Sequence, residues 1–129
     1  MRIVLSAVVL LALAVPAVRA DDTPAAAKTR KLLQTKISVD FSGTRMAEVK
    51  EELMNEVKGL KVMLDNKGGV SNNRTVTYKA EGKTVEVVLD EMLKKLGGLG
   101  YIVISRKGNA YDGVVMIKVG DERGHEKKK

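Results

Sequence analysis

The fold is decided by residues 36–64, whose sequence is KISVDFSGTRMAEVKEELMNEVKGLKVML. At its start, Ile37, Val39 and Phe41 alternate with polar residues, which predicts a half-buried strand over about 36–41. Apolar residues then recur every three or four positions. This spacing predicts a helix over about 44–58 that buries one face, with Thr44 as its N-terminal cap. A second strand is expected over about 60–65.

The same pattern recurs at an offset of 39 residues, which places Val76 where the first unit has Ile37 and Met92 where it has Leu53. The turn glycines Gly43 and Gly82 keep the same spacing. Two strand–helix–strand units therefore follow one another. The expected strands of the two units lie at about 36–41, 60–65, 74–80 and 100–106, and the expected helices at about 44–58 and 83–97.

These elements predict an α+β fold. Tandem βαβ-βαβ units form a two-layer sandwich, with two helices on one face of a small mixed sheet. A polar turn at 107–110 leads to an expected fifth strand over 113–119, which forms a C-terminal hairpin with 101–105. The folded domain is expected to cover residues 36–119. The preceding segment 21–35 is predicted to be flexible and the charged segment 120–129 to be disordered.

The N-terminus has the layout of a secretory signal peptide over residues 1–20. A basic start at Arg2 precedes an apolar run to Val18, and small residues precede an acidic pair. Cleavage is expected near Ala20, with Ala17 as the alternative position. The apolar run is shorter than a membrane-spanning helix needs, so a signal peptide is favoured over a membrane anchor. We expect the mature chain to be exported, and therefore periplasmic or extracellular.

The composition excludes several kinds of site. The 129-residue chain has no Cys and one His, so it can have neither disulfides, nor thiolate chemistry, nor a His-rich metal centre. Glu48, Glu51, Glu52 and Glu56 are expected on a solvated helix surface rather than in an acid–base pair. We therefore predict no catalytic residues, no cofactor, no metal site and no enzymatic activity.

The quoted motifs resemble the secretin/TonB short N-terminal (STN-like) domain over about residues 36–106. The matching stretches include Ile37–Phe41, Met46–Leu53, Gly59–Leu60, Val85–Leu93 and Gly98–Ile104. In that family the domain lies outside the cytoplasmic membrane and docks partner proteins, at the periplasmic end of secretin channels or of signalling TonB-dependent receptors. The resemblance thus implies an exported docking module. No channel core, plug or barrel follows Val119, so a channel or receptor role is not expected.

Two surfaces are candidates for binding. If the fifth strand lies at a sheet edge, it could add a strand of a partner protein in the cell envelope, or a second copy in self-association. Its residues are Val114, Val115, Met116, Ile117, Lys118 and Val119. The N-terminal segment around Leu32–Leu33 could equally cover that edge.

The second candidate surface is basic. Lys127, Lys128 and Lys129, with Lys28, Arg30 and Lys31 at the other end, could hold weak contacts with an anionic polymer or lipid. Sequence-specific nucleic-acid binding is not expected, because aromatic residues are few and basic residues are mixed with acidic ones. A protein-interaction module that docks by sheet-edge or sheet-face contacts is the leading hypothesis, and a peripheral binder of anionic envelope polymers or lipid is the alternative.

Overall fold

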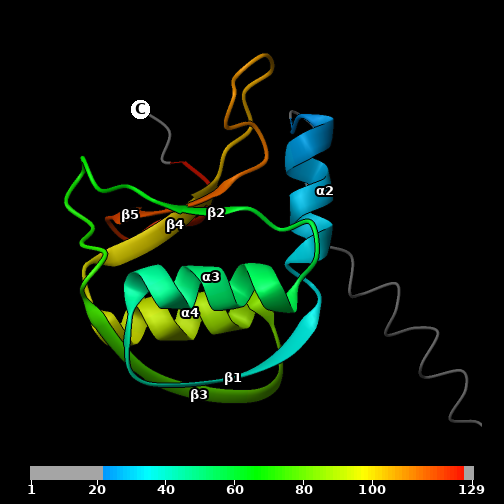
Figure 1. Ribbon diagram of the computed structural model, residues 1–129. Coiled ribbons are helices and arrows are strands. Elements are labelled where there is room, and N and C mark those ends of the chain that lie inside the picture. The colour runs from blue at the N-terminus through cyan, green and yellow to red at the C-terminus, as the bar shows by residue number, and fades with distance from the viewer. Residues whose placement is uncertain (1–21, 127–129) are drawn as a thin grey trace, which may run out of the picture.

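The structure is a computed structural model that describes residues 22–126 (Figure 1). It contains helices α2 (Pro24–Leu32), α3 (Met46–Glu56) and α4 (Val85–Leu96). The strands are β1 (Lys36–Arg45), β2 (Val62–Leu64), β3 (Thr75–Thr84), β4 (Leu99–Val103), β5 (Val115–Val119) and β6 (Arg123–Gly124). The α+β class and the repeated strand–helix–strand order are confirmed. The signal segment and Lys127–Lys129 lie outside the described residues.

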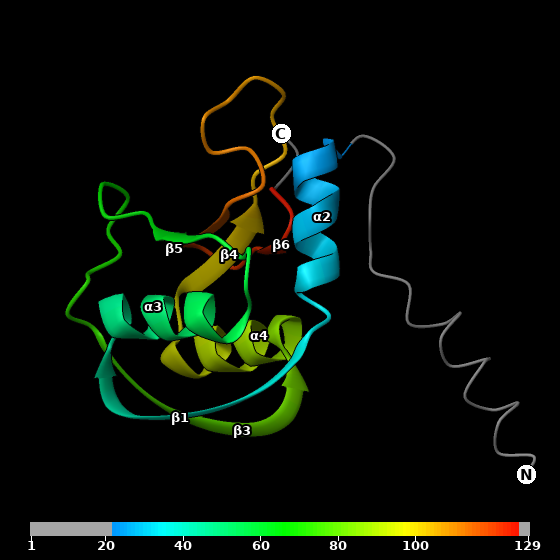
Figure 2. The same cartoon turned by 45° about the vertical axis from the view of Figure 1, so that its right-hand side comes forward.

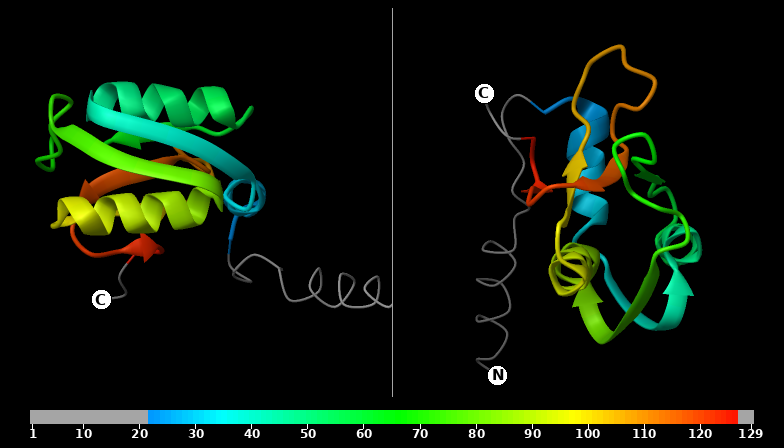
Figure 3. Two further views of the ribbon diagram at one scale, coloured as in Figure 1. Left: turned by 90° about the horizontal axis from the view of Figure 1, so that it is seen from below. Right: turned by 90° about the vertical axis from the view of Figure 1, so that its left-hand side faces the viewer.

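The strands divide into two sheets, one on each side of α3 and α4 (Figures 1 and 2). The two helices lie on one face of a mixed four-stranded sheet of order β2-β5-β4-β6, as a two-layer sandwich requires. The first strand of each unit is not part of that sheet. Instead, β1 and β3 form a two-stranded antiparallel ribbon that crosses the opposite side of the helices (Figure 3). The helices are therefore covered from both sides, and Val49, Leu53 and Leu89 are fully buried.

The ribbon relates the two units by an internal two-fold axis. β1 pairs with β3 so that Asp40 faces Lys79 at the centre, while Lys36 faces Thr84 and Arg45 faces Thr75 at the two ends. Hydrogen bonds at the bulges obey the same symmetry: the Gly43 amide donates to Thr77 Oγ1 and the Gly82 amide to Ser38 Oγ, each at 3.1 Å. Each bulge uses a glycine with positive φ, 60° at Gly43 and 61° at Gly82.

The predicted cap at Thr44 is wrong. Thr44 belongs to β1, because the bulge lets the strand continue to Arg45, and its hydroxyl accepts from the Ser42 amide instead. Arg45 is the N-cap residue of α3 and makes no side-chain capping bond. At the equivalent position of the second unit, the Thr84 hydroxyl caps α4 by accepting from the Val87 amide.

The segment 21–35 was predicted to be flexible, and this is wrong for its described part. Thr23 caps α2 by accepting from the Ala26 amide. The helix packs on the end of the β4–β5 hairpin, where a Cβ at Gly113 would lie 2.9 Å from Ala25 Cβ. The Arg30 guanidinium is buried there, bound to Asp22 Oδ2 at 2.7 Å and to the Gly124 carbonyl at 3.0 Å. Long-range hydrogen bonds thus order a segment whose local composition is polar.

The segment 120–129 was predicted to be disordered, and this is wrong for 120–126. β6 pairs in parallel with β4, with Arg123 beside Tyr101 and Gly124 beside Ile102. Arg123 also pairs with Asp90 of α4 at 2.7 Å. Backbone pairing and ion pairs hold this segment in place, so it needs no apolar residue of its own.

The buried Asp22–Arg30 pair yields a test of stability. The side chains of Arg30 and Asp22 are only 7% and 3% exposed, so Asp22→Ala leaves a buried guanidinium without its counter-charge. We expect a loss of about 3 kcal/mol in the free energy of unfolding, measured by urea denaturation. The double variant Asp22→Ala/Arg30→Met removes both charges and should recover most of that loss. A loss below about 1 kcal/mol for Asp22→Ala would contradict the role of this pair.

Candidate interaction surface

The fifth strand does not lie at a sheet edge, contrary to one of the two expectations. β5 is paired on both sides, in parallel with β2 and antiparallel with β4. The prediction that Val114–Val119 offers a free edge is therefore wrong. The physical reason is the internal symmetry, since β2 and β4 run in opposite directions with room for one strand between them. The segment around Leu32–Leu33 does not cover β5 either, because the Leu33 carbonyl instead accepts from Glu86 at the start of α4.

Side chains of β5 alternate between the two faces of the sheet. Val115 and Ile117 are completely buried against the helices, within the main core. Met116 and Lys118 point to the other face and are half-buried, and Val119 at the end of the strand is 48% exposed. We call the face that carries Met116 the outer face of the sheet.

The outer face carries a second apolar cluster, separate from the main core. It consists of buried Ile102, Ile104 and Val114, with half-buried Met63 and Met116 packed against them. The strand register places three of these side chains in one row, because Met63 faces Met116 across β2–β5 and Met116 faces Ile102 across β5–β4. The two methionines leave this cluster partly open to solvent, and flexible methionines are frequent at binding surfaces.

The sequence carries a local signal for this cluster, although the cluster is not among the predicted sites. Tyr101–Ile104 and Val114–Ile117 are continuous apolar runs, whereas a strand with one solvated face alternates. Such runs indicate apolar side chains on both faces of a sheet. The position of Met63 beside Met116 depends on a parallel pairing between distant segments, which local patterning does not reveal.

Among the strands that the structure describes, β2 and β6 form the two edges of this sheet. The Val115 amide donates to the Lys61 carbonyl and the Asp65 amide to the Ile117 carbonyl, both at 2.9 Å. Lys61, Met63 and Asp65 therefore direct their backbone groups toward β5, and Val62 and Leu64 direct theirs away from the sheet. At the other edge the Arg30 guanidinium donates to the Gly124 carbonyl. Helix α2 thus occupies part of the β6 edge.

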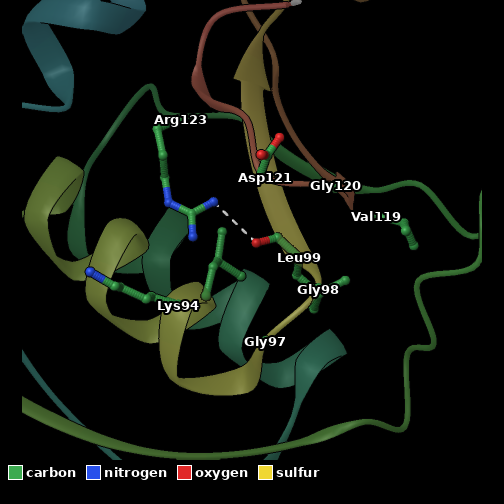
Figure 4. Close-up of a pocket in the computed structure, with 9 residues that line it drawn as sticks. Lys94, Gly97, Gly98, Leu99, Val119, Gly120, Asp121 and Arg123 are labelled. Carbon is green, nitrogen blue, oxygen red and sulfur yellow. Dashed lines mark hydrogen bonds between the residues drawn. The ribbon is translucent and has the colours of Figure 1, made fainter.

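A hollow of about 500 Å³ lies between the end of α4 and the β5–β6 connection (Figure 4). Leu93, Leu99 and Val119 supply apolar contacts there, and Lys94 and Arg123 also line the hollow. The guanidinium of Arg123 is used within the fold, since it donates to the Leu99 carbonyl at 3.1 Å and to Asp90 at 2.7 Å. Within this lining, Arg123 therefore holds β6 to the end of α4.

The ionisable groups on the ribbon side of α4 do not suit acid–base catalysis. Glu91 accepts from the Lys83 ammonium at 2.9 Å and from the Tyr78 hydroxyl at 2.7 Å. The bonds from Lys83 and then Tyr78 lower the pKa of Glu91, and burial together with Glu91 raises the pKa of Tyr78. Both groups thus titrate further from neutral pH, whereas a general acid or base works best near it. No group of three His, Cys, Asp or Glu residues within 22–126 could hold a metal ion.

Comparison of the chain with protein-family models, with curated proteins and with solved structures finds no match. Over the described part of the chain, no helix has the length and apolar character to span a membrane.

The inner face of the sheet gives a prediction about alkaline pH. Burial, and then the charges of Glu86 and Asp90, raise the pKa of Tyr101 to about 12, from an ordinary value near 10. The folded chain thus holds this proton more tightly than the unfolded chain. The contribution of this protonated tyrosine to the free energy of unfolding is fully present below pH ~10 and is lost as the pH rises toward ~12. In a near-ultraviolet titration, Tyr101→Phe should lose a late tyrosinate component and unfold at a higher pH than the parent. Titration of Tyr101 near pH ~10 in the folded chain would contradict this assignment.

Proposed function

We propose that this chain is an exported, non-catalytic protein-interaction module, similar to the secretin/TonB short N-terminal domain, which docks a partner protein on the outer face of its four-stranded sheet. The observation that carries this proposal is the row of Met63, Met116 and Ile102 on the face away from the helices. The two methionines are already packed against a buried cluster, yet both remain partly open to solvent.

The chemistry of this face favours a protein partner over a charged polymer. The charge next to Met116 on the same face is Lys118, and it pairs with Glu122 at 2.9 Å. A partner would therefore meet apolar side chains beside this ion pair, with the exposed Lys61 at the β2 side of the face. Apolar contact of this kind is little affected by salt, whereas binding of an anionic polymer or lipid through basic termini weakens as salt rises.

Affinity capture from the envelope fraction of the source cells tests the partner. Washes at ~0.15 M and ~0.5 M salt shorten the screening length from about 8 Å to under 5 Å. We expect a discrete protein to survive the second wash with the parent chain and to be lost with Met116→Lys, because the substitution places a charge at the centre of the apolar row. The matched control is Val87→Lys, which changes an apolar residue 38% exposed on α4 to the same charge.

Other outcomes of the capture would contradict the proposal. Equal retention by the parent, Met116→Lys and Val87→Lys would exclude the outer face. Recovery of only polymer or lipid, lost at ~0.5 M salt, would assign the function to the basic termini.

Export gives a separate prediction. Asp22 is anchored by Arg30, and the Thr23 amide donates to Ser105 Oγ at 2.9 Å, so the fold uses the residues that directly follow the proposed cleavage site. N-terminal sequencing of the protein recovered from the envelope should begin at Asp21. A mature chain that begins beyond Thr23 would lack both anchors and would contradict cleavage near Ala20.

A further inference from the structure

The two edges of the sheet belong to equivalent strands of the repeat. The offset of 39 residues makes Val62 of β2 the counterpart of Tyr101 of β4, and Leu64 the counterpart of Val103. The backbone directions agree, because Val62 and Tyr101 both direct their amides away from β5. The Tyr101 amide donates to the Glu122 carbonyl at 3.0 Å, so β6 covers the outer edge of β4. In the described part of the chain β2 has no such neighbour.

The contact between β6 and the adjacent helix also has a counterpart. Arg123 of β6 extends to Asp90 of α4, with 2.7 Å between Nε and Oδ1. The residue of α3 at the position of Asp90 is Glu51, whose side chain is 63% exposed. Glu51 contacts Lys50 at 3.5 Å, and a carboxylate has acceptor capacity for a further donor. The first unit therefore offers an outward backbone edge beside an exposed carboxylate.

We propose that β2 binds an extended segment of the partner protein that carries an arginine or a lysine, and that this segment adds to the sheet in parallel with β2 as β6 adds to β4. The Val62 amide donates to a backbone carbonyl of the incoming segment, as the Tyr101 amide donates to Glu122. An arginine or lysine of that segment pairs with Glu51, as Arg123 pairs with Asp90. This inference rests on the proposed docking function and specifies the chemistry of the partner.

Other edges of the molecule are less suited to such an addition. The edge of β6 is partly occupied by Arg30. β1 and β3 each contain register shifts at their bulges, and bulges interrupt regular pairing with an added strand. The β2 edge also adjoins Met63, so a segment added there would continue the apolar row of the outer face. Strand addition and face contact can therefore belong to one docking event.

The segment of this chain that makes the equivalent contact supplies the probe. A synthetic peptide with the sequence of residues 120–126, GDERGHE, is titrated into protein purified from cells that express the full chain. In the protein, β6 already occupies the edge of β4, so the added peptide can bind only at the equivalent edge of β2. We therefore expect the backbone amide NMR signals of Val62 and Leu64 to shift. Glu51→Arg should weaken peptide binding about five-fold, since it turns one exposed ion pair into a repulsive contact.

Two controls isolate the charge pair. Glu56→Arg makes the same charge reversal at another exposed position of α3 and should leave the peptide affinity unchanged. A peptide with Glu in place of its Arg should bind the parent chain weakly and the Glu51→Arg chain better. Lack of any shift at Val62 and Leu64 up to ~5 mM peptide would overturn the inference, because even a millimolar complex would be populated there. Equal effects of Glu51→Arg and Glu56→Arg would also overturn it.

The peptide titration and the capture experiment fail independently. If capture of a partner depends on Met116 but the peptide leaves Val62 and Leu64 unshifted, the proposed docking function stands and only the strand addition is excluded. If capture does not depend on Met116 but the peptide binds at β2, the outer face is excluded as the docking site and strand addition at the β2 edge stands.

Discussion

The antiparallel pairing of β1 with β3 is the constraint on which the rest of the fold depends. Its register centres on Asp40 and Lys79 and thereby sets the two units about a two-fold axis. The helices that follow then lie side by side, and the strands that follow the helices run in opposite directions on their far side. β5 completes the sheet between those strands, parallel to one and antiparallel to the other. A strand in that position cannot be an edge.

The features that the sequence predicts correctly are those encoded locally or by repetition. Period-two alternation at Ile37, Val39 and Phe41, and helical spacing from Met46 onward, each need only a few neighbouring residues. The 39-residue offset then transfers each assignment to the second unit. The errors arise where distant segments meet. Arg30 looks like a solvated basic residue until Asp22 and Gly124 are placed beside it, and β6 has no apolar pattern to reveal its pairing with β4.

The candidate surface shows the same division between local and long-range information. The apolar runs of β4 and β5 indicate that both faces of the sheet carry apolar side chains, which is a local signal. Which residues share the outer face, and which strand is left at the edge, depends on the pairing of β2 with β5. Residues 62–64 and 115–117 are distant in sequence, so the row of Met63, Met116 and Ile102 exists only in the folded chain.

The two units differ in how far they satisfy their own polar groups, and the edge that we propose for strand addition belongs to the first unit. In the second unit Thr84 caps its helix, Lys83 and Tyr78 bind Glu91, and β6 covers β4. In the first unit Arg45 makes no side-chain capping bond, Thr44 and Val39 stand at the positions of Lys83 and Tyr78, and β2 lies at the edge of the sheet.

A fold built from two equivalent units could complete both in the same way. Within residues 22–126 the fold covers the outer edge of β4 but adds no strand to the β2 edge, which lies beside the exposed Glu51 and the half-buried Met63. This asymmetry favours the external segment that we propose for the first unit. The contact between β4 and β6 in the second unit is thus the model for the contact proposed at β2 in the first.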